Sequence, residues 1–523
     1  MKGSLLTTKA LLLFLNCVMI IELMGHLMVI EVYGANSMAT NHGSSARLLH
    51  ENQHHGSNSN NHILKRKMQT IKDSIAARPS TLISPSPNLA PSTGHITGSR
   101  VYHVTSYGAD PTGKTDSTEA LLKAFSEASK SISNGFLIDG INNLGGVEIH
   151  LNGGIYLISR PLQFPTAYIG NILIHGGTLK ASDNFATDRY LIELSVSSSS
   201  QSNQENTTSS PNQKLSTSTA AYNFEYITFR DLMLDCNYKG GGIAVANSLR
   251  IGIDNCYIVH FMSEGIRVDG GHETMIRSSY LGQHITAGSD PGEKNFTGTG
   301  ISLAGNDNVV SDVIVFSADT GIILSGQANL LSGVHLYNKA TGFGGTGIYL
   351  KLAGLTQTRI VNSYLDYTGI VAEDPVQLII ANNFFLGDAF ISFKSVKGVA
   401  NGVNIVDNIF SGSGNGIDIV QLNGPFGDVD EILVDRNSVK GMNVKATVAK
   451  VAVQGNGSSW TADFRKILLF PNLIKHVQYT LSTSGNAFPN YALRNVSENQ
   501  VVIESNVPAT TSVYVMVDQG FGS

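Results

Sequence analysis

The 523 residues could hold several average domains, but a repeat architecture can use the same length in one elongated unit. Charged residues make up 14% of the chain, glycine occurs 54 times and the formal net charge is -5. This composition favours turns and β-structure over charged amphipathic helices. The sequence has neither a basic excess nor a stripe of Lys and Arg, which argues against a nucleic-acid partner.

The N-terminus has the pattern of a secretory signal. A basic start leads into an apolar stretch from about Ala10 to Ile30, and the small residues Gly34-Ala35 follow. We therefore interpret residues 1–34 as a signal peptide. An uncleaved membrane anchor is the alternative, but Glu22 and His26 interrupt the apolar stretch and disfavour it.

Two polar segments are predicted to stay outside any core. Residues 35–99 are rich in Ser, Asn, His and Pro and form a disordered leader, whereas 197–218 form a low-complexity insertion between strands. Export agrees with four Asn-x-Ser/Thr sequons, at Asn206, Asn295, Asn456 and Asn495.

Few cysteines remain after signal removal. Cys17 lies in the signal, so Cys236 and Cys256 are the mature thiols. They could form one disulfide, or they could lie unpaired and buried in neighbouring repeats.

A repeated Gly-Ile pair is the most informative pattern of the chain. Most successive pairs lie 21 to 26 residues apart, and Phe390-Ile391 divides the longest gap of 47. The pairs are Gly242-Ile243, Gly265-Ile266, Gly300-Ile301, Gly321-Ile322, Gly347-Ile348, Gly369-Ile370 and Gly416-Ile417. This period predicts stacked structural units.

A second phrase, in which small polar residues stand between apolar ones, recurs between these pairs. It occurs at 253–258, 360–365, 380–385 and 405–410. Stacked strands about 4.8 Å apart would align its Asn and Ser residues into ladders. No 10 to 15 residue helical pattern separates the strands, so a Rossmann-like fold is excluded.

The predicted fold class is therefore all-β, a right-handed single-stranded parallel β-helix over residues 100–443. From about Val444 the pattern changes to isolated alternating strands, and we expect a small C-terminal β module, cap-like or sandwich-like, over 444–523.

The first part of the predicted helix contains a specific motif. Residues 101–125 include Gly-Ala-Asp at 108–110 and Thr-Asp-Ser-Thr at 115–118, and the glycine-rich strands 145–159 and 176–180 follow. These segments resemble the opening of the pectate-lyase-like β-helix superfamily. The resemblance extends over about residues 100 to 440.

Membership of that superfamily implies a capping helix after the first strand, with Asp116 and Ser117 at its N-terminus. The whole chain, including its leader and its Ser-rich insertion, looks most like the divergent plant polygalacturonases of the QUARTET type. That resemblance implies hydrolysis of pectin in the degradation of the pollen mother cell wall and the separation of pollen tetrads.

The usual polygalacturonase motifs are mostly absent. Gly241 stands where the first Asp is expected, Ser263 and Glu264 replace an Asp pair, and 298–300 read Gly-Thr-Gly instead of Gly-His-Gly. Only Glu264 keeps an acid, so the family's catalytic residues cannot be carried over as a set.

Glycoside hydrolysis needs two carboxyl groups, about 6.5–9.5 Å apart for inversion. Glu264 and Asp319 precede Gly-Ile pairs two rungs apart, or roughly 10 Å along the axis. We predict that they are catalytic, with Asp269 as the next candidate acid. The same acids could simply be solvated at rung corners.

Residues that alternate with the inward Ile and Val should face outward. Arg267, Tyr349 and Lys351 then line one face, with cations for uronate carboxylates and a ring for a sugar, and His272 could overhang it. We predict that these four bind substrate. A solvated sheet face would account for the same residues.

The leading hypothesis is a secreted, monomeric polygalacturonase of the cell wall, endo-acting and inverting, that binds pectin and needs no metal or other cofactor. One alternative is β-elimination by a lyase, with Arg267 as the base and calcium in an acidic groove. The other is a non-catalytic pectin-binding wall protein. Nucleotide-binding and structural zinc motifs are absent from the sequence.

Overall fold

The computed structural model describes residues 100–138, 140–195, 222–286, 291–484, 486 and 488–520. The predicted signal peptide, the leader 35–99 and the insertion 197–218 lie outside the described residues.

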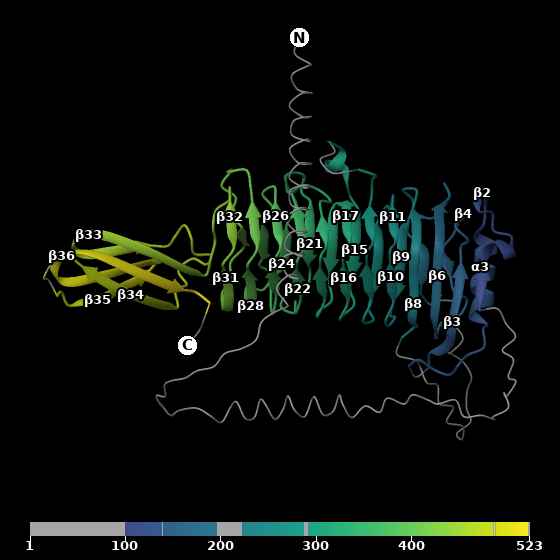
Figure 1. Cartoon of the computed structure of the whole chain (residues 1–523), viewed down its shortest axis with the longest axis horizontal. Helices are drawn as coiled ribbons and strands as arrows, with labels where there is room; N and C mark the ends of the chain where they lie inside the picture. The colour runs from purple at the N-terminus through teal and green to yellow at the C-terminus, as the bar shows by residue number, and fades with distance from the viewer. Residues whose placement is uncertain are drawn as a thin grey trace, which may run out of the picture. The chain divides into compact units, whose positions relative to one another are not determined.

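From Val101 to Lys440 the chain winds into stacked rungs, whose strands pair in parallel with those of the next rung (Figure 1). Two sides of each rung belong to one sheet, because β6 (Ile169–Ala181) and β8 (Phe224–Asp235) run across the corner between them. The predicted parallel β-helix is confirmed.

The strands of the three sides are as follows. The first side contains β1 (Val101–His103), β3 (Asn142–His150), β10 (Gly252–Asp254), β13 (Met275–Arg277), β16 (Val309–Ser311), β19 (Leu330–Ser332), β22 (Arg359–Val361), β25 (Ile379–Ala381), β28 (Val399–Val406) and β31 (Asp428–Asp435). The second contains β2 (Thr112–Asp116), β4 (Ile155–Ile158), β11 (Tyr257–Val259), β14 (Tyr280–Gly282), β17 (Ile314–Ser317), β20 (His335–Leu336), β23 (Tyr364–Asp366), β26 (Phe384–Leu386), β29 (Ile409–Ser411) and β32 (Ser438–Lys440). The third side, sheet B, contains β5 (Leu162–Gln163), β7 (Tyr190–Leu194), β9 (Gly241–Ala246), β12 (Glu264–Asp269), β15 (Thr299–Leu303), β18 (Thr320–Leu324), β21 (Thr346–Leu350), β24 (Ile370–Glu373), β27 (Ile391–Lys394) and β30 (Val420–Asn423).

The Gly-Ile pairs mark the start of the sheet B strands. Their isoleucines are aligned from rung to rung and are buried in one continuous core. Glycine is required before them because successive backbones approach closely there: a Cβ on Gly265 would lie 2.7 Å from the Gly300 carbonyl oxygen. The last pair is an exception to the prediction. Val420, rather than Ile417, aligns with Ile391, since a turn delays the start of β30.

The predicted polar ladder is present inside the corner between the first two sides. The Asn383 side chain accepts a hydrogen bond from the Ser363 N–H, and Asn408 and Asn437 repeat this contact on the next two rungs at 3.0 Å. Each Nδ2 also donates to a main-chain carbonyl of the preceding rung. The ladder thereby satisfies buried backbone groups that no strand pairing reaches.

Both ends of the helix core are covered. At the first rungs α3 (Thr118–Ser129) packs Leu121 and Phe125 into the core, and the Asp116 side chain accepts the Thr118 N–H. At the other end, Leu469 and Phe470 return from the C-terminal module to pack on the last rung.

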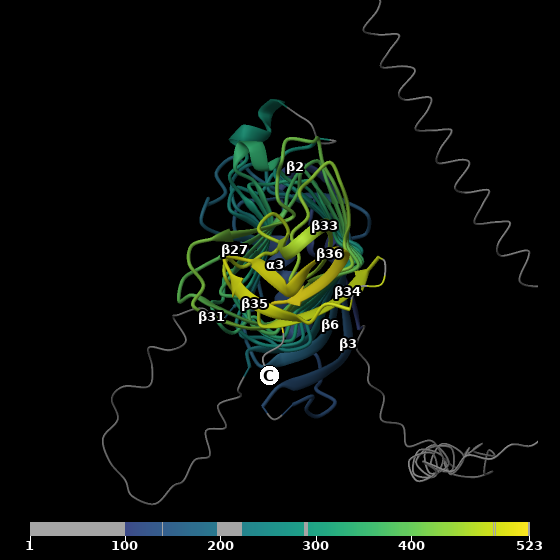
Figure 2. The same ribbon diagram turned by 90° about the vertical axis from the view of Figure 1, so that its left-hand side faces the viewer.

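Residues beyond the helix form a four-stranded antiparallel sheet (Figure 2). Its strands are β33 (Val448–Asp463), β34 (His476–Thr483), β35 (Tyr491–Ser497) and β36 (Gln500–Asp518). One face packs on a small core around Trp460 and Phe464, whereas Tyr514 on the other face is exposed. The described strands of this module are thus hydrogen-bonded into one sheet with one covered face.

The two cysteines in the described part of the chain are free. Cys236 and Cys256 are both buried in the helix core, and burial raises the pKa of Cys256 to about 12. The structure thus has unpaired buried thiols, the second of the two arrangements that the sequence allowed.

Three histidines lie side by side on the first rungs. His103, His150 and His175 occupy the same register position on β1, β3 and β6, with ring centroids 5.4 and 4.6 Å apart. Burial and the neighbouring His175 and His103 lower the pKa of His150, an effect that Glu148 partly opposes.

Replacing Asn408 by Ala should destabilise the helix by roughly 3 kcal/mol, because it leaves the Asn383 N–H and side chain without their acceptor inside the core. Urea unfolding would measure the loss. Asn404→Ala, on the outer face of the preceding strand β28, is the matched control. Equal stability of the two variants would contradict the role given to the ladder.

Stability should fall as the pH drops below about 6.5, where histidines of the unfolded chain take up protons that folded His150 resists. The contribution of His150 is complete above that pH and is lost on acidification. Thermal unfolding of His150→Gln should therefore depend less on pH than that of the parent. His476→Gln, at an exposed site, should keep the parent's dependence.

Candidate active site

The outer face of sheet B carries most of the predicted site residues. On β12 the side chains alternate: Ile266 and Val268 are buried, whereas Arg267 and Asp269 are exposed. Arg267 shares a register column with Tyr349 on β21, three rungs or about 14 Å away. Arg267 and Tyr349 therefore occupy the outward-facing positions that the sequence predicted.

Glu264, at the start of β12, is held by a residue that the sequence patterns did not indicate. The Tyr190 hydroxyl on β7 donates to Glu264 Oε2 at 2.6 Å, although β9 lies between the two strands. The same phenol interacts with Arg267, which in turn binds Asp269 at 2.7 Å. Burial, and after it the Glu264 carboxylate, raises the pKa of Tyr190 to about 12.

The glycine on the intervening strand makes this contact possible. A Cβ on Gly241 would lie 2.3 Å from two ring carbons of Tyr190 and 2.6 Å from the Glu264 carbonyl oxygen. The ring thus passes over Gly241, at the position where the resembled motif has an Asp.

Asp319 lies just before β18, two rungs from Glu264. Lys339 donates to Asp319 Oδ1 at 2.5 Å and to the Phe296 carbonyl at 3.1 Å, and its side chain is only 7% exposed. Asp319 is therefore tied to the segment that follows η3 (Pro291–Asn295), where Glu293 is also buried.

By contrast, Asp269 lies at the far end of β12 from Glu264. Five steps of extended strand put their backbones about 16 Å apart, while Tyr190 and Arg267 connect the two carboxylates by side-chain contacts. Glu264 and Asp319 lie two rungs apart, roughly 10 Å along the axis.

A second polar cluster surrounds Tyr349. Its hydroxyl donates to Glu373 at 2.6 Å, and Lys394 donates to both, at 2.8 and 3.0 Å. Burial opposes ionisation of Glu373, but the hydrogen bonds from Tyr349 and Lys394 prevail and lower its pKa, with a smaller effect of Lys351. Glu373 and Lys394 come from the two rungs after Tyr349, and sequence spacing did not single them out.

A hollow of about 470 Å³ opens next to this cluster, over the last rungs of sheet B. Val371, Ser392 and Gln421 line it, and they continue the register column of Tyr349. The outer face of sheet B is therefore hollowed beside the predicted substrate-binding tyrosine.

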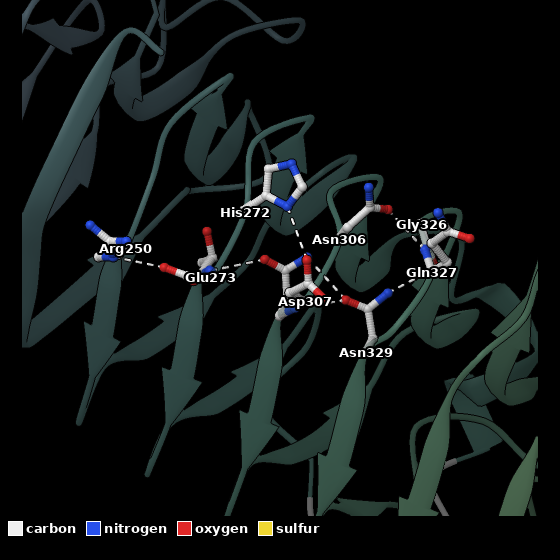
Figure 3. Close-up of polar contacts among 10 residues, drawn as sticks. Arg250, His272, Glu273, Asn306, Asp307, Gly326, Gln327 and Asn329 are labelled. Atoms are coloured by element: carbon white, nitrogen blue, oxygen red, sulfur yellow. Dashed lines mark hydrogen bonds and ion pairs between the residues drawn. The ribbon is translucent and has the colours of Figure 1, made fainter. Parts of the chain in front are cut away.

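His272 lies in a different part of the molecule's surface, the corner that follows the sheet B strands (Figure 3). Its Nδ1 is 3.0 Å from Asp307, while Glu273 pairs with Arg250. The structure therefore brings His272 together with a corner network and not with Glu264.

No three His, Cys, Asp or Glu side chains in the described part of the chain are arranged so that they could hold a metal ion.

Comparisons with known proteins agree with the fold and with the length of the chain. Residues 101–344 match the family described as rhamnogalacturonase A/epimerase, pectate lyase-like. The polygalacturonase QRT3 of Arabidopsis thaliana is 58% identical over 460 residues, which cover 87% of this chain and 91% of that protein.

Solved structures resemble the chain more distantly. An endo-xylogalacturonan hydrolase from Aspergillus tubingensis aligns with a TM-score of 0.45 at 11% identity, over 66% of this chain and 95% of that one. ORF18 of Geobacillus virus E2 aligns with a TM-score of 0.48 at 12% identity, over 78% and 77%.

Residues 101–344 of the β-helix thus match the pectate lyase-like family. The chain belongs to the family of the polygalacturonase QRT3, as the 58% identity over most of both chains shows.

Substituting Gly241 by Ala should cost roughly 1–3 kcal/mol, because the added methyl group has to displace the Tyr190 ring or the backbone of β12. Thermal unfolding would reveal the loss. Gly427→Ala is the control, since no atom lies within 4 Å of the corresponding Cβ. Similar midpoints for both variants would refute the close contact.

Proposed function

We propose that the protein is a secreted polygalacturonase, which hydrolyses the α-1,4-galacturonan backbone of pectin in the plant cell wall. The observation that carries the proposal is the 58% identity to a polygalacturonase over nearly the whole length of both chains. The name of that relative supports a part in the separation of pollen tetrads.

The reaction is proposed to be an inverting glycoside hydrolysis by Glu264 and Asp319. Their two-rung offset, roughly 10 Å along the axis, lies close to the separation that leaves room for a water molecule. Asp269 is proposed as an auxiliary acid that orients Arg267.

Substrate binding is assigned to the cations and rings of the same face. Arg267 and Lys351 would pair with galacturonate carboxylates, and Tyr349 would contact a sugar ring. His272 would contact the substrate only where the polysaccharide extends to the corner beyond β12. An open face along stacked strands suits a polymer that is cut internally, which supports endo action.

Secretion is supported by features at the surface. Three of the four sequons, at Asn295, Asn456 and Asn495, lie at exposed positions where a glycan can be attached. Among the described residues, no helix combines the length and the apolar character needed to cross a membrane.

The Glu264→Gln variant should lose 10²-fold or more of the activity on polygalacturonate, because it removes a proton-transfer group. Reducing ends released per minute would measure the rate. Glu148→Gln, which changes a strand glutamate outside sheet B, is the matched control and should retain activity. Full activity of Glu264→Gln would remove the central assignment.

Product analysis separates the reaction types. Hydrolysis adds one water to the oligogalacturonides, and inversion changes the anomeric configuration of the first product. Unsaturated, ultraviolet-absorbing products would instead establish elimination, and tight pectin binding without any chain shortening would establish a binding protein.

A further inference from the structure

Tyr190 reaches Glu264 across a complete rung of the helix. The two residues lie 74 positions apart in sequence, on β7 and β12, and their contact is a 2.6 Å hydrogen bond on the outer face of sheet B. Side chains on neighbouring rungs often touch, but a contact over two rungs requires that nothing projects from the strand between them. Gly241 meets that requirement.

Tyr190 is itself fixed from behind. Its backbone N–H donates to Glu193 Oε1 at 3.0 Å, and Glu193 is only 6% exposed. Arg189 and Gln163 each donate a hydrogen bond of 2.6 Å to Glu193 Oε2. The phenol therefore extends from an anchored backbone, and Tyr190 as a whole is only 7% exposed.

The charged groups around the Tyr190 hydroxyl show that it acts as a hydrogen-bond donor to Glu264. Glu264 accepts from the hydroxyl, Arg267 approaches the same oxygen, and Asp269 balances Arg267. Because the phenol keeps its proton up to about pH 12, it is a donor at every pH at which a wall enzyme works. A donor at this distance restricts the orientation of the Glu264 carboxyl group, which accepts the hydrogen bond.

We propose that Tyr190 is a positioning residue for Glu264, which orients this carboxyl group for its part in proton transfer. The Tyr190 ring lies over Gly241, which occupies the position of the first Asp in the polygalacturonase motif. The inference rests on the proposed function, since it presupposes that Glu264 takes part in catalysis.

The test is the Tyr190→Phe variant of the whole chain, assayed on polygalacturonate across the pH range. Loss of the hydroxyl should lower kcat roughly 10- to 100-fold with little change in KM. Tyr156→Phe is the matched control: it also removes a buried hydroxyl, one that donates to the Leu151 carbonyl at 2.7 Å, from a strand outside sheet B. It should lower stability alone and leave kcat and KM unchanged.

A second variant tests the same role if Tyr190→Phe does not fold. Incorporation of 3-fluorotyrosine at position 190 keeps the ring and makes the hydroxyl a stronger donor, so kcat should differ from that of the parent while KM stays the same. A kcat equal to that of the parent in either folded variant, with Glu264→Gln inactive, would overturn the role of Tyr190 and leave the proposed function intact. Full activity of Glu264→Gln would overturn both.

Discussion

Parallel stacking of rungs about 4.8 Å apart is the constraint on which the rest of the structure depends. Each strand pairs with the strand of the rung before and the rung after, so side chains at one register position form a column along the axis. Inward columns of Ile, Val and Leu merge into one core. Amide side chains that point inward must find their hydrogen-bond partners on the neighbouring rungs. Asn383, Asn408 and Asn437 do so by repeating one contact along the axis.

The same constraint shapes the outer face of sheet B. Functional groups can approach each other only along a column, across one rung or two, or along a strand. Along a strand the backbones of two residues quickly move apart, as for Glu264 and Asp269 at opposite ends of β12. Across rungs it remains short, and for this reason Tyr190 meets Glu264, and Lys394 meets Tyr349, despite separations of 74 and 45 residues in sequence.

Small residues determine which of these contacts exist. Gly241 removes the side chain that would block Tyr190, and Gly265 allows the backbones to approach at the start of β12. A family motif that places an acid on β9 cannot coexist with the Tyr190 ring in that position, since a single Cβ there already collides with the ring. The replacement of the motif's Asp by Gly241 and the contact between Tyr190 and Glu264 therefore depend on each other.

The sequence by itself determined the repeat, the β-helix, its polar ladders and the outward direction of Arg267 and Asp269, because all of these follow from local periodicity. It also indicated Glu264, the one acid left at a motif position. Only the tertiary structure decided the partners: Tyr190 for Glu264, Lys339 for Asp319, Glu373 and Lys394 for Tyr349, and Asp307 for His272. The number of residues in each rung varies with its loops, so which side chains share a column depends on register, and register is a property of the packed helix.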